Sequence, residues 1–357
     1  MLLISWLVVT GLWATKVAGR CPEVCNCTQR VSAERTEVDC FQRGLKSIPP
    51  KLPQDTWILK LGENHLEDLP ANFLKDVPNT ESVNLERNAI KSLHPQALSG
   101  ATRLMLLNLF GNQISRLPPK EFQDQINLRF LMLGQNKINS IKSEMFTGLR
   151  NLSDLDLPIN SITTLPPNGF QPLIALKVLD LAFNKIQKIS VKAFVGLKEL
   201  QFLSLDNNNL KMIPAGVFKP LTKLEMLVLD NNHLTVVTAD MFEGLPNLQE
   251  LYLRNNEIGT IPEDMFKNTP KLTQLALSGN KLKTIDGNSL SQLTGLKDIY
   301  LHENPWACDC KLKSLLQWMS KTSANLSPLE ALKCISPAEN YGKTFPLLEE
   351  HNLKCTA

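Results

Sequence analysis

Apolar residues recur along this chain in a block that repeats every 24 residues. The block reads LDLAFNKI over residues 179–186, LSLDNNNL over 203–210 and LVLDNNHL over 227–234, and a further leucine stands three residues before each block. Its L-x-L step alternates apolar with variable residues, which is the period of a β-strand. We therefore expect one short strand per repeat, with the leucines directed into the core and the variable residues directed outward.

An asparagine follows each strand, five residues after its first leucine. A short polar side chain at a turn can bond backbone groups that the turn leaves unpaired, and an unbroken 24-residue interval favours this role over glycosylation or catalysis. The asparagines are predicted to form a structural ladder of eleven members: Asn64, Asn88, Asn112, Asn136, Asn160, Asn184, Asn208, Asn232, Asn256, Asn280 and Asn304.

A second apolar column lies ten residues after the asparagines. At that spacing, phenylalanine is more typical of a packed spine than of a ligand cage. The apolar side chains of one repeat cannot offset the conformational entropy of ordering 24 backbone residues, so the repeats must stack into a solenoid. The column consists of Phe122, Phe146, Phe170, Phe194, Phe218, Phe242 and Phe266.

Eight cysteines flank the repeats, four on each side, and none lies among them. In an oxidising compartment such even sets indicate disulfides, and here they would close the open apolar ends of the solenoid. Zinc binding is the alternative, which the C-x-C spacing and the expected secretion disfavour. Spacing alone leaves the connectivity open, but we expect the pairs Cys21–Cys27, Cys25–Cys40, Cys308–Cys334 and Cys310–Cys355.

The segment after the last repeat predicts a helical cap. Leu312, Leu315, Leu316 and Met319 recur at helical spacing, with Trp318 on the same helix. The flanking cysteines favour a helix that lies over the open end of the core rather than one that binds a membrane.

The amino-terminal segment is typical of a secretory signal peptide. Residues 2–14 are almost wholly apolar and lead to the small residues 17–19, although no basic residue precedes them. No other apolar run is long enough to span a membrane, so we expect a soluble secreted protein without a membrane anchor. The expected organisation is a signal peptide (1–19), an amino-terminal cysteine-rich cap (20–50), the repeats (51–303) and a carboxy-terminal cysteine-rich cap (304–357).

Three sequons predict glycosylation at Asn26, Asn151 and Asn325. Asn151 is the best candidate because it stands just before an expected strand, at the edge of a repeat. Asn26 lies within a local disulfide loop, and Pro328 follows the third sequon.

Catalytic and metal-binding motifs are absent from the sequence. It contains neither G-x-S-x-G nor H-E-x-x-H, and Gly342-Lys343-Thr344 lacks the first glycine of a phosphate-binding loop because Pro337 stands there. The five histidines are scattered, and the net charge of +3 comes without a basic run. We therefore expect a protein that is not an enzyme, has no cofactor or metal, and does not bind nucleic acid.

The repeat register identifies the residues of the concave face, which lie six, four and two positions before each ladder asparagine. Eight acids and two bases, Lys60 and Arg254, occupy these positions, so the face carries a formal charge of −6 on a chain of +3. Negative charge is therefore concentrated on this face. The acids are Glu86, Asp154, Asp156, Asp180, Asp206, Asp230, Glu250 and Asp298.

Aromatic residues share this face, namely Phe110, Phe130, Phe202, Tyr252 and Tyr300. Tyrosine among charged residues is common at protein-binding surfaces, and a sheet roughly 50 Å long suits a folded protein partner. Alternatively, the carboxylates merely keep the sheet soluble. We predict that a basic protein surface binds Asp154, Asp156, Asp180, Phe202, Asp206, Asp230, Glu250, Tyr252 and Tyr300.

The repeat L-x-x-L-x-L-x-x-N-x-L, with cysteine-rich caps, resembles the secreted or cell-surface leucine-rich-repeat proteins of vertebrates. Residues 52–56 and 69–72, and the tail from Asn304 to Thr344, are most similar to the leucine-rich α-2-glycoprotein type, and the chain also resembles the platelet glycoprotein V and chondroadherin types. The resemblance implies an α/β solenoid, a curved horseshoe with a parallel concave sheet and disulfide-bonded caps. Unlike the leucine-rich α-2-glycoprotein type, both caps have complete cysteine sets.

Three functions are compatible with this resemblance. The first is a secreted non-catalytic protein-binding glycoprotein that modulates extracellular signalling, with transforming-growth-factor-β (TGF-β) receptor components of endothelial cells, or basic cytochrome c, as the implied partners. The second is an adhesive matrix protein that binds collagen or cell-surface receptors. The third is a carrier subunit of a secreted enzyme.

Overall fold

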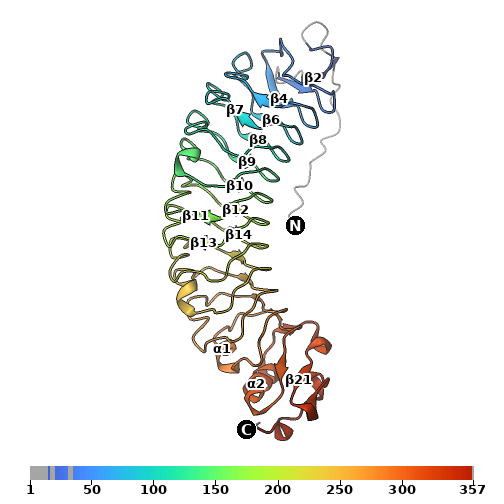
Figure 1. The fold of residues 1–357 in the computed structure, drawn as a ribbon, viewed down its shortest axis with the longest axis vertical. Helices are drawn as coiled ribbons and strands as arrows, with labels where there is room; N and C mark the ends of the chain where they lie inside the picture. The colour runs from blue at the N-terminus through green and yellow to red at the C-terminus, as the bar shows by residue number, and fades with distance from the viewer. Residues whose placement is uncertain (1–14, 17–20, 31–34, 356–357) are drawn as a thin grey trace.

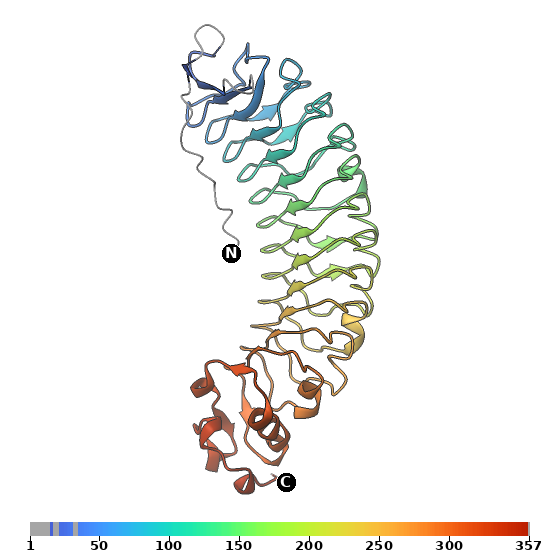
Figure 2. The ribbon, with the colours of Figure 1, turned by 180° about the vertical axis from the view of Figure 1, so that it is seen from behind.

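The computed structural model describes residues 15–16, 21–30 and 35–355. The expected signal peptide, residues 1–19, therefore lies outside the described residues except for Thr15 and Lys16. The described chain is a curved solenoid, with one continuous sheet along its concave side and turns and short helices on its convex side (Figures 1 and 2). The predicted horseshoe with its parallel concave sheet is confirmed.

The concave sheet contains fifteen strands among the described residues, and the strands of the repeats follow one another in chain order. The strands are β1 (Thr15–Lys16), β2 (Asn26–Arg30), β3 (Arg35–Asp39), β4 (Thr56–Lys60), β6 (Ser82–Asn84), β8 (Leu106–Asn108), β9 (Phe130–Met132), β10 (Asp154–Asp156), β12 (Val178–Asp180), β14 (Phe202–Ser204), β15 (Met226–Val228), β16 (Glu250–Tyr252), β17 (Gln274–Ala276), β18 (Asp298–Tyr300) and β20 (Asn325–Leu326).

Neighbouring strands of the repeats pair in parallel with a register of 24 residues. Between β10 and β12, for example, Leu155 lies opposite Leu179 and Asp156 lies opposite Asp180. In both of these strands the central leucine is buried and the residues beside it are partly exposed. The predicted alternation is therefore confirmed, and residues that are 24 positions apart become neighbours on the concave face.

The ladder asparagines bind each repeat to the one before it. The amide of Asn160 donates to the carbonyl oxygens of Leu133 and Leu157, at 3.0 and 3.1 Å, and its oxygen accepts the N–H of Ile138 at 2.9 Å. The other repeats show the same pattern, and every ladder asparagine is buried. These side chains satisfy backbone groups that would otherwise be buried without partners, as the sequence predicted.

The phenylalanine column is buried behind the sheet, and its members are at most 1% exposed. Phe146 stacks on Phe170 with 5.8 Å between ring centroids, and Phe194 stacks on Phe218 at 5.9 Å. The predicted spine is confirmed: it is part of one continuous core that reaches from cap to cap.

The convex side follows a period of 48 residues, which the 24-residue pattern does not reveal. Glycines with positive φ stand at 100, 148, 196 and 244, in every second repeat. The convex elements are the pairs β5 (Asp68–Leu69) with β7 (Ser92–Leu93) and β11 (Thr164–Leu165) with β13 (Lys188–Ile189), and the helices η1 (Ser143–Phe146), η2 (Ala239–Phe242) and α1 (Gly287–Ser291).

Disulfides hold both caps, with all four expected pairings. The amino-terminal cap adds the antiparallel pair β2–β3 to the sheet. At the other end, α2 (Lys313–Lys321) contacts α1 and buries Leu315 and Trp318, as expected of a helix that covers the core. The carboxy-terminal elements are β19 (Trp306–Ala307), η3 (Cys310–Leu312), α2 (Lys313–Lys321), η4 (Leu329–Ala331), β21 (Cys334–Ser336), η5 (Ala338–Asn340), η6 (Phe345–Leu347) and η7 (Glu350–Asn352).

We predict that Gly148→Ala lowers the free energy of unfolding by about 2–4 kcal/mol, against about 1 kcal/mol for Gly100→Ala. Both glycines have positive φ, but a Cβ at Gly148 would lie 2.2 Å from the carbonyl oxygen of Phe122, whereas a Cβ at Gly100 meets nothing within 4 Å. Urea unfolding of the two variants measures the difference. Equal losses would show that the close approach of the convex turns is unimportant.

Candidate protein-binding face

The residues predicted to bind a partner lie on the concave sheet or directly after its strands. Asp154, Asp156 and Asp180 come from β10 and β12, and they lie in adjacent repeats. Asp206 follows β14 in the next repeat. These four acids form a continuous group, which we call the acidic cluster.

Neighbouring carboxylates of the acidic cluster differ in their hydrogen bonds. Asp180 accepts the N–H of Ala182 at 2.9 Å. The equivalent residue after Asp156 is Pro158, which has no N–H to donate. Asp156 therefore lacks the hydrogen bond that its neighbour receives.

This difference appears in the acidity of the two groups. Burial, and to a lesser extent the carboxylates of Asp180 and Asp154, raise the pKa of Asp156 to about 6. Burial also raises the pKa of Asp180, against the lowering effect of the Ala182 N–H bond. The centre of the acidic cluster is thus a place where negative charge is poorly stabilised by the protein itself, and a cation supplied by a partner would stabilise it.

The carboxylate of Asp206 accepts hydrogen bonds from side chains of its own repeat. The hydroxyl of Ser204 donates to one of its carboxylate oxygens, and the amide of Asn207 donates to the other at 2.6 Å. The side chain remains partly exposed, so the carboxylate is oriented and still reachable by solvent.

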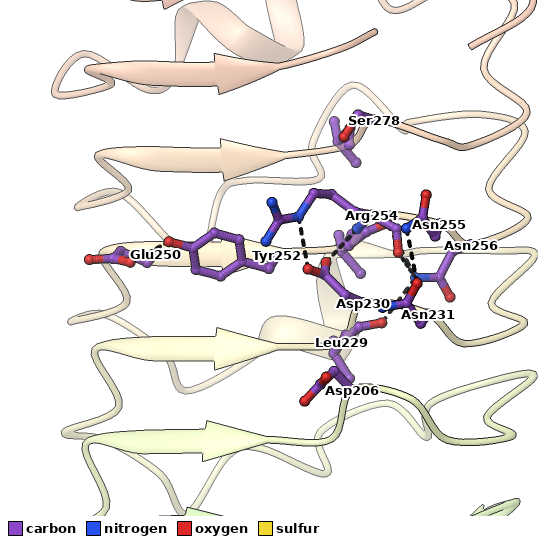
Figure 3. A network of polar contacts seen from close by, with 12 residues as sticks. Asp206, Leu229, Asp230, Asn231, Glu250, Tyr252, Arg254, Asn255, Asn256 and Ser278 are labelled. Carbon is purple, nitrogen blue, oxygen red and sulfur yellow. Dashed lines mark hydrogen bonds and ion pairs between the residues drawn. The ribbon is translucent and has the colours of Figure 1, made fainter. Parts of the chain in front are cut away.

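Asp230, by contrast, forms an ion pair with an arginine of the next repeat. Arg254 donates its backbone N–H at 2.6 Å and its Nε–H at 2.8 Å to this carboxylate, as Figure 3 shows. Only 9% of the Asp230 side chain is exposed. Burial raises the pKa of Asp230 despite the opposing effect of Arg254. Its negative charge is therefore matched locally, and Asp230 is less accessible to a partner than the partly exposed Asp180 and Asp206.

Glu250, Tyr252 and Arg254 make a second polar group in one repeat (Figure 3). The Tyr252 hydroxyl donates to Glu250 at 2.6 Å, and the Arg254 guanidinium lies over the tyrosine ring, 5.0 Å from its centroid. Burial, with the Glu250 bond, raises the pKa of Tyr252. These contacts hold the ring in place on the concave face.

The remaining aromatic residues are more widely spaced. Phe202 lies on β14 between Val178 and Met226 of the neighbouring strands. Tyr300 lies on β18, separated from Tyr252 by Ala276 of β17. The predicted residues therefore form a band along the sheet rather than a single pocket.

The three sequon asparagines are exposed. The amide of Asn151 donates to the carbonyl oxygen of Ile126 at 2.8 Å, and that of Asn325 donates to Asp298 at 3.2 Å. Asn26 lies on β2, opposite Asp39. Their glycosylation stays a prediction.

Neither a metal site nor a membrane-spanning helix is found in the part of the chain that the structure describes. In residues 15–16, 21–30 and 35–355, no three histidine, cysteine, aspartate or glutamate side chains are grouped so that they could hold a metal ion. Within the same residues, no helix has the length and apolar character needed to cross a membrane.

One structural feature of the repeats involves residues that are not among the concave positions predicted from the sequence. The residue directly before each ladder asparagine has positive φ in every repeat. We call this set the left-handed column; it consists of Glu63, Arg87, Gly111, Gln135, Ile159, Phe183, Asn207, Asn231, Asn255, Gly279 and Glu303. The sequence already marked two members of this column: Ile159 and Phe183 are apolar, whereas the other repeats have a polar residue or glycine at the same position.

The chain belongs to the leucine-rich-repeat family. The family pattern "Leucine rich repeat" matches residues 58–114, 102–160, 150–210, 198–258 and 246–305, and "Leucine rich repeat N-terminal domain" matches residues 20–53. Together with the curved sheet, the buried asparagines and the disulfide-bonded caps, these matches define the class of protein.

Similar curated proteins match only in part. Leucine-rich repeat-containing protein 3 of Danio rerio is 39% identical over 82 residues, which are 23% of this chain and 30% of that protein. Chondroadherin-like protein of Mus musculus is 32% identical over 109 residues, or 30% of this chain and 14% of that protein. The matched segment thus spans about a third or less of these relatives. Neither is named as an enzyme, and the family is typically non-catalytic.

Two solved structures share the fold. A chain of the octameric complex of Latrophilin 3, Unc5D and FLRT2, in which FLRT2 is the leucine-rich-repeat component, has a TM-score of 0.81 and 28% identity, covering 94% of this chain and all of that one. A chain of the Drosophila Toll–Spatzle complex has a TM-score of 0.67 and 20% identity, covering 87% and 57%. Both come from protein complexes, in keeping with a family that mediates protein–protein interactions.

We predict that Arg254→Gln lowers the free energy of unfolding by about 2–4 kcal/mol, because it leaves the buried Asp230 carboxylate without its guanidinium partner. Urea unfolding measures this loss. The double variant Asp230→Asn with Arg254→Gln is the control, and it should regain most of the lost stability. If the double variant is no more stable than the single one, the ion pair does not account for the loss.

We predict that Asp156→Asn raises the free energy of unfolding by about 1–2 kcal/mol at about pH 7.5, a value reduced for partial exposure of the carboxyl. The folded pKa of about 6 exceeds the ordinary value of 3.8, so the native state holds the extra proton between them. Asp156 should therefore contribute a fall in stability as pH rises from about 4 to about 6, in addition to the falls contributed by other buried carboxyls such as Glu121, whose pKa burial raises to about 7. Asparagine fits the position, since Asn84 and Asn108 occupy it in other repeats.

Thermal unfolding across this pH range checks the prediction, with Asp298→Asn as a charge-matched control at the far end of the sheet. The control should keep the whole fall in stability between about pH 4 and pH 6, whereas in Asp156→Asn this fall should be smaller by about 1–2 kcal/mol. An equal fall in Asp156→Asn and in the control would show that Asp156 does not titrate in this range.

Proposed function

We propose that the protein is a secreted, non-catalytic glycoprotein that binds the basic surface of another protein on its concave face. The acidic cluster carries this proposal. Its carboxylates share one face in adjacent repeats, and Asp156 receives no N–H bond from its own turn. Cationic side chains of a partner would reduce the repulsion between these carboxylates, which gives a driving force and a preference for basic surfaces.

The resemblance to the leucine-rich α-2-glycoprotein type supports a more specific form of the proposal. In that form the protein modulates extracellular signalling through TGF-β receptor components of endothelial cells, or binds basic cytochrome c. Cytochrome c is the more convenient first probe because its positive charge suits the acidic cluster.

A second candidate is an adhesive matrix protein that binds collagen or cell-surface receptors. The partial match to chondroadherin-like protein favours it. The two candidates differ in location, since the first is expected in plasma and the second in insoluble matrix.

We predict that Asp154→Lys with Asp206→Lys weakens cytochrome c binding by roughly 10–100-fold at low salt and slows association. Both carboxylates belong to the acidic cluster, and neither is buried. The control is Glu144→Lys with Glu263→Lys, which makes the same change in net charge at exposed positions behind the sheet. Surface plasmon resonance at low and high salt measures both rates.

The control should bind as the unsubstituted protein does. Equal weakening in both variants would mean that overall charge, rather than the acidic cluster, governs the interaction. Unchanged binding in the concave variant would contradict the proposed site.

A further inference from the structure

The left-handed column runs along the edge of the sheet where the strands end, and most of its residues suit its backbone. Glycine and asparagine adopt positive φ readily, whereas branched or bulky side chains rarely do. Ile159 has φ of 55° and Phe183 has φ of 51°. These two consecutive repeats therefore accept backbone strain that an asparagine in the same place would relieve.

Side chains of this column meet across repeats. Arg87 pairs with Glu63 at 3.0 Å, and the amide of Asn255 donates to Asn231 at 2.9 Å. In each case the polar side chain has a polar partner in the neighbouring repeat. At these two places, polar side chains of adjacent repeats in the column therefore satisfy one another.

Ile159 and Phe183 are the apolar exception in this column. They occupy neighbouring repeats, and the N–H of Ile159 donates to Ala182, the residue before Phe183. The two residues are 48% and 55% exposed, so neither contributes its full apolar surface to the core. The fold alone gives no reason for a β-branched and an aromatic side chain at two strained, exposed positions, and strain of this kind is a sign of function.

The acidic cluster adjoins this pair. Asp156 and Asp180 each lie three residues before a member of the pair, and the N–H of Phe183 donates to the backbone carbonyl of Asp206. Lys185, two residues after Phe183, is exposed. Carboxylates therefore border the apolar pair on the side of the sheet, where basic groups of a partner would lie.

From these contacts we propose that Ile159 and Phe183 form an apolar anchor site for a loop of a partner protein that presents one apolar side chain flanked by lysine or arginine. The apolar side chain of the partner packs against the pair, and its basic neighbours face Asp156, Asp180 and Asp206. This inference rests on the proposed function, which assigns the acidic cluster to protein binding, and it adds the position and the chemistry of the contact beside it.

The test uses two short lysine-rich peptides that differ only at a central residue, leucine in one and serine in the other. They are titrated against the unsubstituted protein, the double variant Ile159→Asn with Phe183→Asn, and the control Gln135→Asn. Gln135 belongs to the same column, with φ of 52°, in the adjacent repeat. Both asparagine variants relieve the backbone, but only the double variant removes apolar surface.

We expect the leucine peptide to bind the unsubstituted protein about tenfold more tightly than the serine peptide. The double variant should bind both peptides equally, and Gln135→Asn should keep the tenfold preference. The melting temperature should rise by about 1–2 °C for each asparagine introduced. A melting temperature that falls in the double variant would mean that the pair supports the fold, which overturns the proposal.

The remaining outcomes separate this proposal from the proposed function. If both peptides bind the unsubstituted protein with equal affinity, or if the preference for leucine survives in the double variant, the anchor site is wrong and the acidic cluster can stand. If neither peptide binds, the acidic cluster fails as a site for basic partners, and the anchor site fails with it.

Discussion

The fold depends on the hydrogen bonds that each ladder asparagine makes to its own repeat and to the one before. In Asn184, for example, the amide donates to Leu157 and Leu181 while the oxygen accepts from Ile162. A single repeat cannot offset its own ordering entropy, so these shared bonds, with the buried leucines and phenylalanines between them, make neighbouring repeats stable together. The disulfide-bonded caps are required by the same logic, because the first and last repeats each lack one neighbour.

This scaffold leaves the outward residues of the strands free to vary. Because every strand keeps the same register, the residue at one outward position lies beside the residues 24 positions earlier and later in the chain. Aspartates in consecutive repeats thus become a band of carboxylates on one face, with a pKa near 6 at Asp156 as the electrostatic consequence. A surface of this kind repels itself until a partner supplies positive charge, which connects the packing of the repeats with the proposed function.

Much of the fold could be predicted from residues alone. The position of each ladder asparagine gives the strand, its buried leucines and its outward positions, and the cysteine sets predicted all four disulfides. The 48-residue period of the convex side was missed, since it depends on glycines at 100, 148, 196 and 244 rather than on the leucine pattern. The charge state of the candidate site was not predicted either: the register places Arg254 beside Asp230, but the burial of Asp230 and its hydrogen bonds from Arg254 are seen only in the structure.

The sequence by itself determined the repeat, its register, the core and the residues available to the concave face, because these follow from a strict spacing of side-chain types. Tertiary structure decided which of those residues remain available. It buried Asp230 beneath Arg254, left Asp156 beside Pro158 without a donor, and exposed Ile159 and Phe183 on a strained backbone. The physical reason is that exposure, hydrogen bonding and pKa depend on neighbours in the adjacent repeats and on the backbone conformation, neither of which a residue's own spacing specifies.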